Sequence, residues 1–134
     1  MKHTKTNKEV KQLLQEVIIL INYCGTNKIK NIVLNTMLFR NFDILDGLSK
    51  IIDKSISEEL KDLEQKALKL DEDFTKGIAL LTTEEKLRHT ELIEQYNKDM
   101  DESIELDLYL IDIESIATVE MDVYESQILN HFLK

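Results

Sequence analysis

Apolar residues recur at spacings of three and four along most of the chain, which is the pattern of a helix with one buried face. In the N-terminal part, this pattern predicts one helix over about residues 7–24 and a second over about residues 28–52. Gly25 stands where a left-handed cap would end the first helix. Gly47 is the expected break or kink in the second helix.

The most regular pattern follows in the next segment and predicts one continuous helix. Its apolar positions are spaced alternately by three and four residues, as in a coiled-coil seam, and are Leu60, Leu63, Ala67, Leu70, Phe74, Gly77 and Leu81. A glycine inside such a seam is unfavourable by about 1 kcal/mol relative to alanine. Gly77 therefore marks either a close helix crossing or a bend.

Capping boxes predict where helices begin, because a Ser or Thr and an acid three residues later satisfy two backbone N–H groups. The chain has three such pairs: Thr6 with Glu9, Ser55 with Glu58, and Thr82 with Glu85. The third pair separates the seam helix from a more polar helix over about residues 83–101. Together these two helices predict a hairpin, at about residues 57–103, that projects from a single helical domain spanning residues 1–134.

The last third of the chain interleaves acids with large apolar residues and contains no Lys or Arg between Asp99 and Leu133. Its periodicity fits two structures. Ile104, Leu106 and Leu108 alternate as in a strand, whereas Ile104, Leu108 and Ile111 also fit a helical stripe. Because no Gly or Pro lies between the runs to turn a hairpin, we interpret the segment as a helix. Such a helix would lie centrally in the fold, packed on several sides.

The composition supports the same fold class. The 134 residues include no Pro and three Gly, which disfavours the many tight turns of a β-sandwich or barrel. The predicted fold is all-α: an antiparallel bundle of four to five helices with a coiled-coil-like helical hairpin.

Charge is unevenly distributed along the chain. The formal net charge of −9 combines +4 in residues 1–50 with −13 in residues 51–134. An acidic protein repels nucleic acid, so we do not expect direct nucleic-acid binding. No apolar stretch approaches the ~20 residues of a membrane span. The single cysteine, Cys24, fits a reducing compartment, so a cytoplasmic protein, or a nuclear one in a eukaryote, is expected.

Candidate chemistry is sparse. Asp71 and Asp73 begin like a calcium loop, but Lys76 stands where the tight-turn glycine belongs. Nucleophile motifs, phosphate-binding loops and Cys-x-x-Cys pairs are absent from the sequence. We therefore expect neither an enzyme nor a bound cofactor or metal.

The leading functional hypothesis is a non-enzymatic protein–protein interaction module, such as a small subunit, adaptor, chaperone or inhibitor. Its apolar helix faces exceed what a short bundle readily buries, so we expect a homo- or hetero-oligomer, with a basic protein as one possible partner. The predicted partner-binding residues are Leu60, Leu63, Leu70, Phe74, Glu105, Tyr109, Asp112 and Tyr124.

Two alternatives from other classes remain open. One is an acidic nucleic-acid mimic that blocks a basic groove with the carboxylates between Asp99 and Glu125. The other is a metal-dependent helical-bundle hydrolase that uses Glu102, Glu105 and Asp112 on one helix face.

Overall fold

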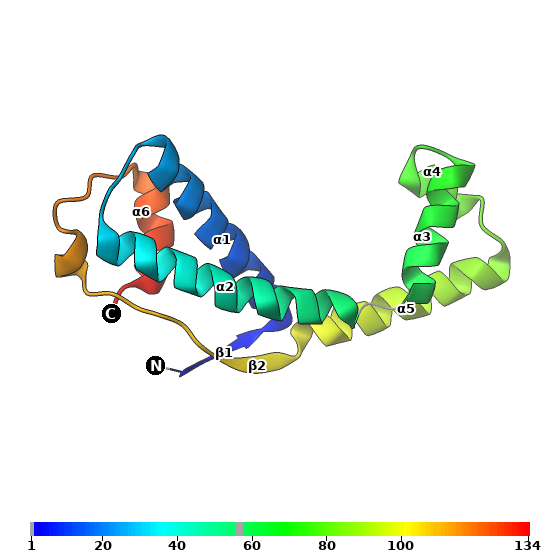
Figure 1. The fold of residues 1–134 in the computed structure, drawn as a ribbon. Helices are drawn as coiled ribbons and strands as arrows, with labels where there is room; N and C mark the ends of the chain where they lie inside the picture. The colour runs from blue at the N-terminus through cyan, green and yellow to red at the C-terminus, as the bar shows by residue number, and fades with distance from the viewer. Residues whose placement is uncertain (1, 56–57) are drawn as a thin grey trace. The chain divides into compact units, whose positions relative to one another are not determined.

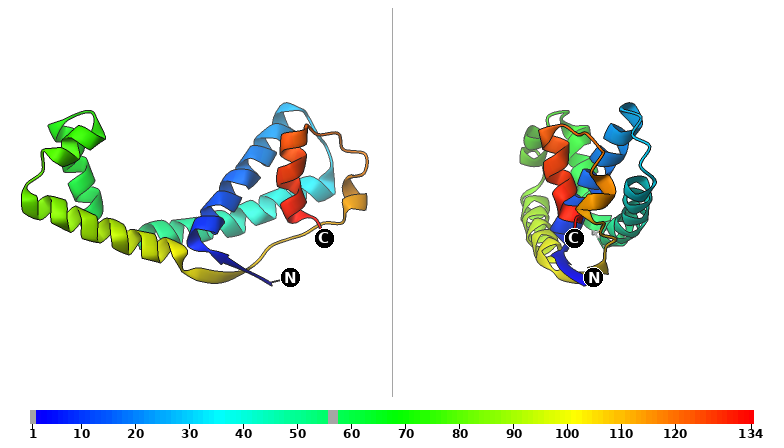
Figure 2. Two further views of the ribbon diagram at one scale, coloured as in Figure 1. Left: turned by 180° about the vertical axis from the view of Figure 1, so that it is seen from behind. Right: turned by 90° about the vertical axis from the view of Figure 1, so that its left-hand side faces the viewer.

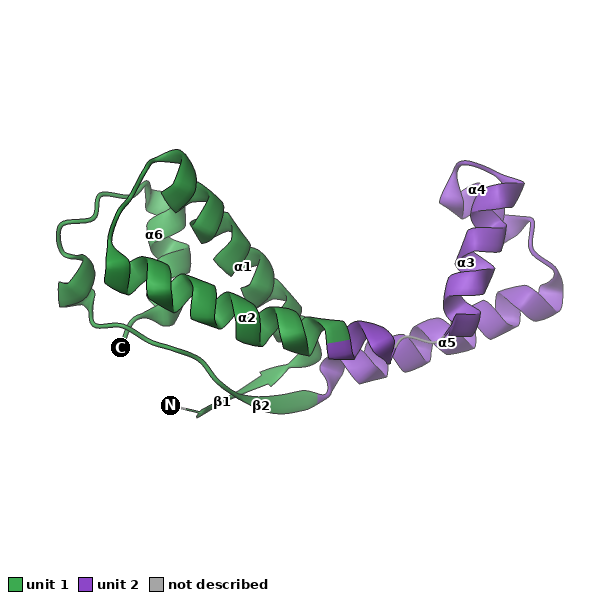
Figure 3. Ribbon diagram, in the orientation of Figure 1, with its two compact units in different colours: residues 1–50, 103–134 green, residues 51–102 purple. Residues whose placement is uncertain are grey.

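The computed structural model describes residues 2–55 and 58–134 (Figure 1). The chain divides into two compact units (Figure 3): unit 1 comprises residues 1–50 and 103–134, and unit 2 comprises residues 51–102. Among the described residues, no helix is both long and apolar enough to cross a membrane. The fold class is confirmed, since the structure is mostly α-helical with helix–helix packing and one small sheet.

Unit 1 is built on two long helices and a short one. These are α1 (Asn7–Thr26), the part of α2 (Ile32–Lys54) up to residue 50, and α6 (Val123–Leu129), which packs against α1 and continues into the 3₁₀ turn η2 (Asn130–Phe132). The predicted capping box begins α1: Glu9 N–H donates to Thr6 Oγ1, and Thr6 N–H donates to Glu9 Oε1, both at 3.1 Å. The largest fully buried side chains of the unit are Phe132, Leu20, Leu34, Leu38, Leu45, Val10, Val17 and Asn41.

A two-stranded antiparallel sheet joins distant parts of unit 1. Strand β1 (Lys2–Thr6) pairs with β2 (Ser103–Asp107), and the two lie side by side in Figures 1 and 2. In the register, Lys2 lies opposite Asp107 and Thr6 lies opposite Ser103. Residues 2–6, whose sequence pattern predicts no element, therefore form a strand.

The predicted helix in the last third of the chain is wrong. Residues 103–107 form β2, the segment after it is extended, the 3₁₀ helix η1 spans Ile113–Ile116, and α6 begins only at Val123. The alternation of Ile104, Leu106 and Leu108 correctly indicated a strand, which the structure places at residues 103–107. The strand that pairs with β2 is β1, near the N-terminus, and not a neighbouring strand joined by a hairpin turn. The absence of a turn residue in this segment was therefore no evidence against a strand.

Neither of the two glycines expected to shape the helices of unit 1 ends or breaks a helix. Helix α1 continues through Gly25, and the left-handed residue is Lys28, with φ of 53°. Ile29 N–H donates to Cys24 O and Lys28 N–H donates to Gly25 O, at 2.9 and 3.3 Å, which is the Schellman pattern of a helix end. Gly47 lies inside the continuous helix α2, so the predicted break does not occur there, while a kink at Gly47 stays a prediction.

Unit 2 contains α3 (Glu58–Leu70), α4 (Phe74–Ala79) and α5 (Thr83–Asp101). The expected continuous seam helix is wrong, because it breaks at Asp71–Asp73. There, Asp71 Oδ1 accepts from Asp73 N–H at 2.8 Å, and Asp73 caps α4 by accepting from the N–H groups of Thr75 and Lys76. These local hydrogen bonds compete with the helical ones. The capping box at Thr82 and Glu85 is confirmed, whereas the one at Ser55 involves residues 56–57, which lie outside the described residues.

Gly77 marks a close helix crossing, one of the two predicted roles. A Cβ atom at Gly77 would overlap the carbonyl group of Ala67 and would lie 3.2 Å from its Cα atom. The backbone of α4 thus packs directly on that of α3. That residues 1–134 form a single domain with a hairpin at about 57–103 stays a prediction, and unit 2 covers nearly the same residues as that hairpin.

Candidate functional site

Tyr109, one of the predicted partner-binding residues, is held by a buried asparagine of α2. Asn41 Oδ1 accepts from Tyr109 N–H at 2.7 Å, and Asn41 Nδ2 donates to Tyr109 O at 2.9 Å. Asn41 is fully buried, and the residues one turn away on its face of the helix, Met37, Leu38 and Leu45, are buried and apolar. Tyr109 follows β2 in an extended segment, so its backbone groups need a partner from elsewhere, and Asn41 satisfies both.

The neighbouring residue of α2 contacts the ring of the same tyrosine. The guanidinium carbon of Arg40 lies 5.1 Å from the centre of the Tyr109 ring, within the range of a cation–π contact. Tyr109 as a whole remains 45% exposed. Asn41 therefore fixes the backbone of Tyr109 while Arg40 orients its ring at the surface.

Arg40 and Tyr109 border an apolar groove between α2 and the extended segment that follows β2. The groove has a volume of about 290 Å³ and is lined by Ile32, Val33, Thr36, Met37, Arg40, Tyr109, Leu110 and Ile111. We call it the α2 groove. Ile32 at its end is 81% exposed, and Val33 is also exposed. An exposed cluster of this kind is unusual, because large apolar side chains are normally withdrawn from water.

The extended wall of the groove is held in place by the end of the chain. Ile111 N–H donates to Phe132 O at 3.0 Å, and Lys134 N–H donates to Ile111 O at 2.9 Å. Phe132 is fully buried in the core of unit 1. Both walls of the groove are therefore anchored: one is a long helix, and the other is hydrogen-bonded to Asn41 and to the C-terminal residues.

The four predicted seam residues separate into an interior pair and an exposed pair. Leu60 is buried and Leu63 is half-buried, whereas Leu70 and Phe74 are 46% and 40% exposed. The break between α3 and α4 separates Leu70 from Phe74, and the Phe74 ring makes an edge contact with the His89 ring at 6.4 Å. The seam is thus partly an internal contact of unit 2.

The remaining predicted residues lie on different elements. Glu105 is an exposed residue of β2, Asp112 is an exposed residue just before η1, and Tyr124 is an exposed residue of α6. The helix face that was to align Glu102, Glu105 and Asp112 for the metal-dependent alternative does not form. Within residues 2–55 and 58–134, no group of three or more His, Cys, Asp or Glu side chains is arranged to hold a metal ion.

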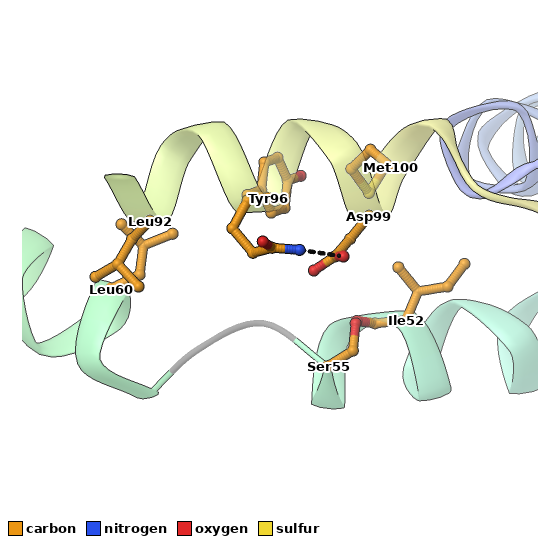
Figure 4. Close-up of a pocket in the computed structure, with 8 residues that line it drawn as sticks. Ile52, Ser55, Leu60, Leu92, Tyr96, Asp99 and Met100 are labelled. Carbon is orange, nitrogen blue, oxygen red and sulfur yellow. Dashed lines mark hydrogen bonds between the residues drawn. The ribbon is translucent and has the colours of Figure 1, made fainter. Parts of the chain in front are cut away.

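Unit 2 contains a small cavity next to α5. It measures about 60 Å³ and is lined by Leu60 of α3, by Ile52 and Ser55, and by Leu92, Gln95, Tyr96, Asp99 and Met100 of α5 (Figure 4). Gln95 Nε2 donates to Asp99 Oδ1 at 3.0 Å, so two of its polar groups bind each other. At this volume the cavity admits a few water molecules rather than a substrate.

A more polar pocket of unit 1 lies between β1, α1 and η2, where His3, Lys5, Glu9, Glu16 and His131 line it. Its two carboxylates already have structural partners. His131 Nδ1 lies 2.8 Å from Glu16 Oε2, and hydrogen bonds from the Thr6 backbone and hydroxyl lower the pKa of the Glu9 carboxyl. A lowered pKa is the opposite of the raised pKa that a general acid needs, so the Glu9 carboxyl does not fit that role.

The one thiol of the chain is withdrawn from solvent. Cys24 is buried in α1, and desolvation raises the pKa of its thiol. A buried thiol with a raised pKa is a weak nucleophile, because the thiolate is the reactive form.

Comparisons with known proteins give no indication of a function for this chain. No protein-family model matches this chain, and neither the search of curated proteins nor the search of solved structures found a match.

Tyr109 is the one lining residue of the α2 groove among the predicted partner-binding residues. The other lining residues, Ile32 and Arg40 among them, and Asn41, which holds Tyr109, were not predicted. A signal for Asn41 was present, because Leu34, Leu38, Asn41 and Leu45 occupy successive positions of one helical face. A lone asparagine on an otherwise apolar face indicates a buried side chain that needs a hydrogen-bond partner. The identity of that partner, 68 residues away, was not readable from the spacing.

Proposed function

We propose that this protein is a non-enzymatic protein–protein interaction module that docks through the α2 groove. The observation that carries the proposal is the exposure of Ile32 and Val33 beside a tyrosine whose backbone and ring are both held in place. Exposed apolar clusters rimmed by polar residues are typical of interaction sites.

The residue types of the groove support the same proposal. Tyrosine and arginine are enriched among the residues that contribute most to protein–protein binding, and the groove pairs one of each. A partner protein that covers the Tyr109 ring buries apolar surface. The Tyr109 hydroxyl can still make a hydrogen bond at the rim of the contact. Because Asn41 already orders Tyr109, binding loses less conformational entropy than it would with a mobile loop.

The shape of the groove favours a partner that inserts apolar side chains. The volume of about 290 Å³ accommodates one or two large side chains, and most of the lining is aliphatic. A helix or an extended segment that carries a leucine or phenylalanine would fill it. This mode of recognition needs no catalytic group, in keeping with the paired carboxylates and the buried thiol of unit 1.

The test compares two charge insertions at exposed leucine or isoleucine positions. Ile32→Glu places a carboxylate in the α2 groove, whereas Leu87→Glu places one on α5, where Leu87 is also exposed. Each full-length variant is used to capture proteins from the native cell, and the bound proteins are quantified beside those of the unmodified protein. We expect a partner that is retained by Leu87→Glu and reduced at least tenfold by Ile32→Glu and by Tyr109→Ala.

Thermal melting and light scattering complete this test. Ile32 is so exposed that Ile32→Glu should leave the melting temperature nearly unchanged. If the groove binds a second copy of the chain, the mass in solution falls to that of a monomer in Ile32→Glu and in Tyr109→Ala but not in Leu87→Glu. The proposal is wrong if all three variants retain the same partners and the same mass as the unmodified protein.

A further inference from the structure

The chain has two arginines, and they differ in their partners. Arg88 of α5 binds two carboxylates: its Nε donates to Glu59 at 2.8 Å, and its Nη1 donates to Glu91 at 3.1 Å. Within residues 2–55 and 58–134, the Arg40 guanidinium makes no hydrogen bond or ion pair, and its contact is with the Tyr109 ring. Arg40 thus retains its capacity to bind a carboxylate of another molecule.

The contact with the tyrosine ring leaves the hydrogen-bond donors of Arg40 available. A guanidinium stacks on an aromatic ring through its face, whereas its five N–H groups point outward in its plane. Two of these groups match the two oxygens of a carboxylate and bind them with parallel hydrogen bonds. Because Arg40 is exposed, a carboxylate from a partner can reach it while Tyr109 stays in place.

The α2 groove differs in charge from the protein as a whole. The formal net charge of the chain is −9, which favours basic partners over the surface in general. Among the described residues that line the groove, however, Arg40 is the one charged residue, and the others are apolar except for Thr36 and Tyr109. Charge complementarity therefore favours an acidic group in the segment that fills this groove.

The exposed face of α2 continues beyond the groove. Phe39 is 57% exposed and lies on the same side of the helix as Ile32, because residues seven apart share a helical face. Ile32, Thr36 and Phe39 form an exposed stripe that is two turns, or about 10 Å, long. A stripe of this kind is the surface against which a second helix packs.

We propose that the partner segment in the α2 groove is an amphipathic helix that supplies a carboxylate to Arg40. Its apolar residues cover Ile32 and Phe39, and one Asp or Glu side chain pairs with the guanidinium. Arg40 lies eight residues after Ile32, which is about 12 Å along a helix. Since the partner helix has the same rise per residue, its acid lies seven or eight positions from the apolar residue that contacts Ile32.

The inference rests on the proposed function, since it names the partner of the same groove, but the two can fail separately. Ile32→Glu prevents binding if the groove docks any apolar segment. Arg40→Gln weakens binding only if the partner supplies a carboxylate. Loss of binding in Ile32→Glu together with full binding in Arg40→Gln would keep the docking groove and reject the acidic helix.

The first experiment selects ligands from a displayed library of helical peptides in which the residues of one face are varied. The full-length protein is the target, and peptides that also bind Ile32→Glu are discarded. We expect the retained peptides to carry Asp or Glu seven or eight positions from a large apolar residue. A second selection on Arg40→Glu should instead enrich Lys or Arg at that position, because the charge of the groove is reversed.

The second experiment measures the affinity of one selected peptide by calorimetry. Arg40→Gln should weaken binding about tenfold, and Arg40→Lys, which keeps the charge but not the planar fork, should weaken it less. Lys8→Gln removes a positive charge from an exposed position of α1 and should leave binding within about twofold. Thermal melting verifies that each variant is folded.

An amide in place of the acid in the peptide identifies the contact itself. This peptide should bind the unmodified protein about tenfold more weakly than the acidic peptide does. Arg40→Gln should bind the two peptides equally, because the pair is already broken in that variant. Added salt should weaken binding of the acidic peptide more than that of the amide peptide.

Four results would overturn this inference. Retained peptides without an acid at the expected position would show that the groove does not select a carboxylate. An equal loss of affinity in Lys8→Gln would reduce the effect to net charge. A preference of Arg40→Gln for the acidic peptide would place the contact of the acid elsewhere. A dimer of the unmodified protein that Arg40→Gln dissociates, measured by light scattering, would identify a second copy as the occupant.

Discussion

Asn41 and Tyr109 exchange two hydrogen bonds, at 2.7 and 2.9 Å, through which a helix side chain acts as the pairing partner of an extended segment. An asparagine side chain carries the same donor and acceptor as a peptide group, so it substitutes for one residue of a neighbouring strand. The exchange joins α2 to the segment that forms the other wall of the α2 groove. Its loss should therefore affect both stability and binding.

We expect Asn41→Ala to destabilise the protein by about 2–4 kcal/mol, because it leaves the backbone groups of Tyr109 without partners and opens a cavity beside α2. The measurement is the free energy of unfolding from urea denaturation. Asn97→Ala, at an exposed position of α5, is the control and should change stability by less than about 0.5 kcal/mol. Equal effects of the two substitutions would contradict the role assigned to Asn41.

Two glycines in helices should respond to alanine in opposite directions. Gly77→Ala introduces a Cβ that overlaps the Ala67 carbonyl, so we expect a loss of about 1–3 kcal/mol. A Cβ at Gly47 meets nothing within 4 Å, and alanine is the better helix former, so Gly47→Ala should gain up to about 1 kcal/mol. Thermal melting of the two variants measures both changes in stability. A stabilised Gly77→Ala variant would mean that α3 and α4 do not pack at this point.

Acidification should weaken the packing of α3 on α5. Hydrogen bonds from the Arg88 guanidinium hold the pKa of the Glu59 carboxyl below its ordinary value, and bonds from Lys66 and then from the Thr82 backbone lower that of Glu85. A carboxyl with a lowered pKa stabilises the folded state at pH above its unfolded value. That stabilisation is lost as the pH falls through the folded pKa.

Hydrogen exchange of α3 and α5, followed from about pH 7 to about pH 3 and corrected for the intrinsic pH dependence, measures this effect. We expect protection to decrease below the ordinary pKa of a glutamic acid. Glu59→Gln with Glu85→Gln should lower protection at neutral pH and flatten its dependence on pH. An unchanged pH dependence in that double variant would exclude these two carboxyls as the cause.

The interior and exposed ends of the predicted seam should respond differently to a charge. Leu60→Asp buries an unpaired carboxylate, so we expect severe destabilisation, by more than about 3 kcal/mol. Leu70→Asp places the charge at a half-exposed position and should retain the fold. Light scattering of Leu70→Asp then reports association alone. A lower mass than that of the unmodified protein supports a contact at Leu70, and an unchanged mass argues against one.

Helix-forming segments were the part of the fold that the sequence predicted best. The stripes of α1, α2 and α5, and the capping boxes at Thr6 and Thr82, are local features that depend on residues within a few positions of one another. The end of α3 is also set by local hydrogen bonds, those of Asp71 and Asp73. The sequence pattern there resembled an incomplete calcium loop and did not predict that the helix would end.

Long-range pairing explains most of what the sequence did not predict. The assignment of residues 104–123 required knowledge that residues 2–6 supply the partner of β2, about a hundred positions away. Of the predicted partner-binding residues, Tyr109 lies in the α2 groove, whereas Glu105 lies on β2. Ile32 and Asn41 could not be placed there from local spacing, because the opposite wall of the groove comes from a distant segment.

The sheet formed by β1 and β2 makes unit 1 discontinuous in sequence, and this affects how the protein is synthesised. When residues 2–6 leave the ribosome, the strand that pairs with them has not yet been translated, whereas the whole of unit 2 precedes it. Unit 2, whose contacts are more local, can fold first. The N-terminal segment and α1 must wait, with apolar surface uncovered, until residues 103–134 have been translated.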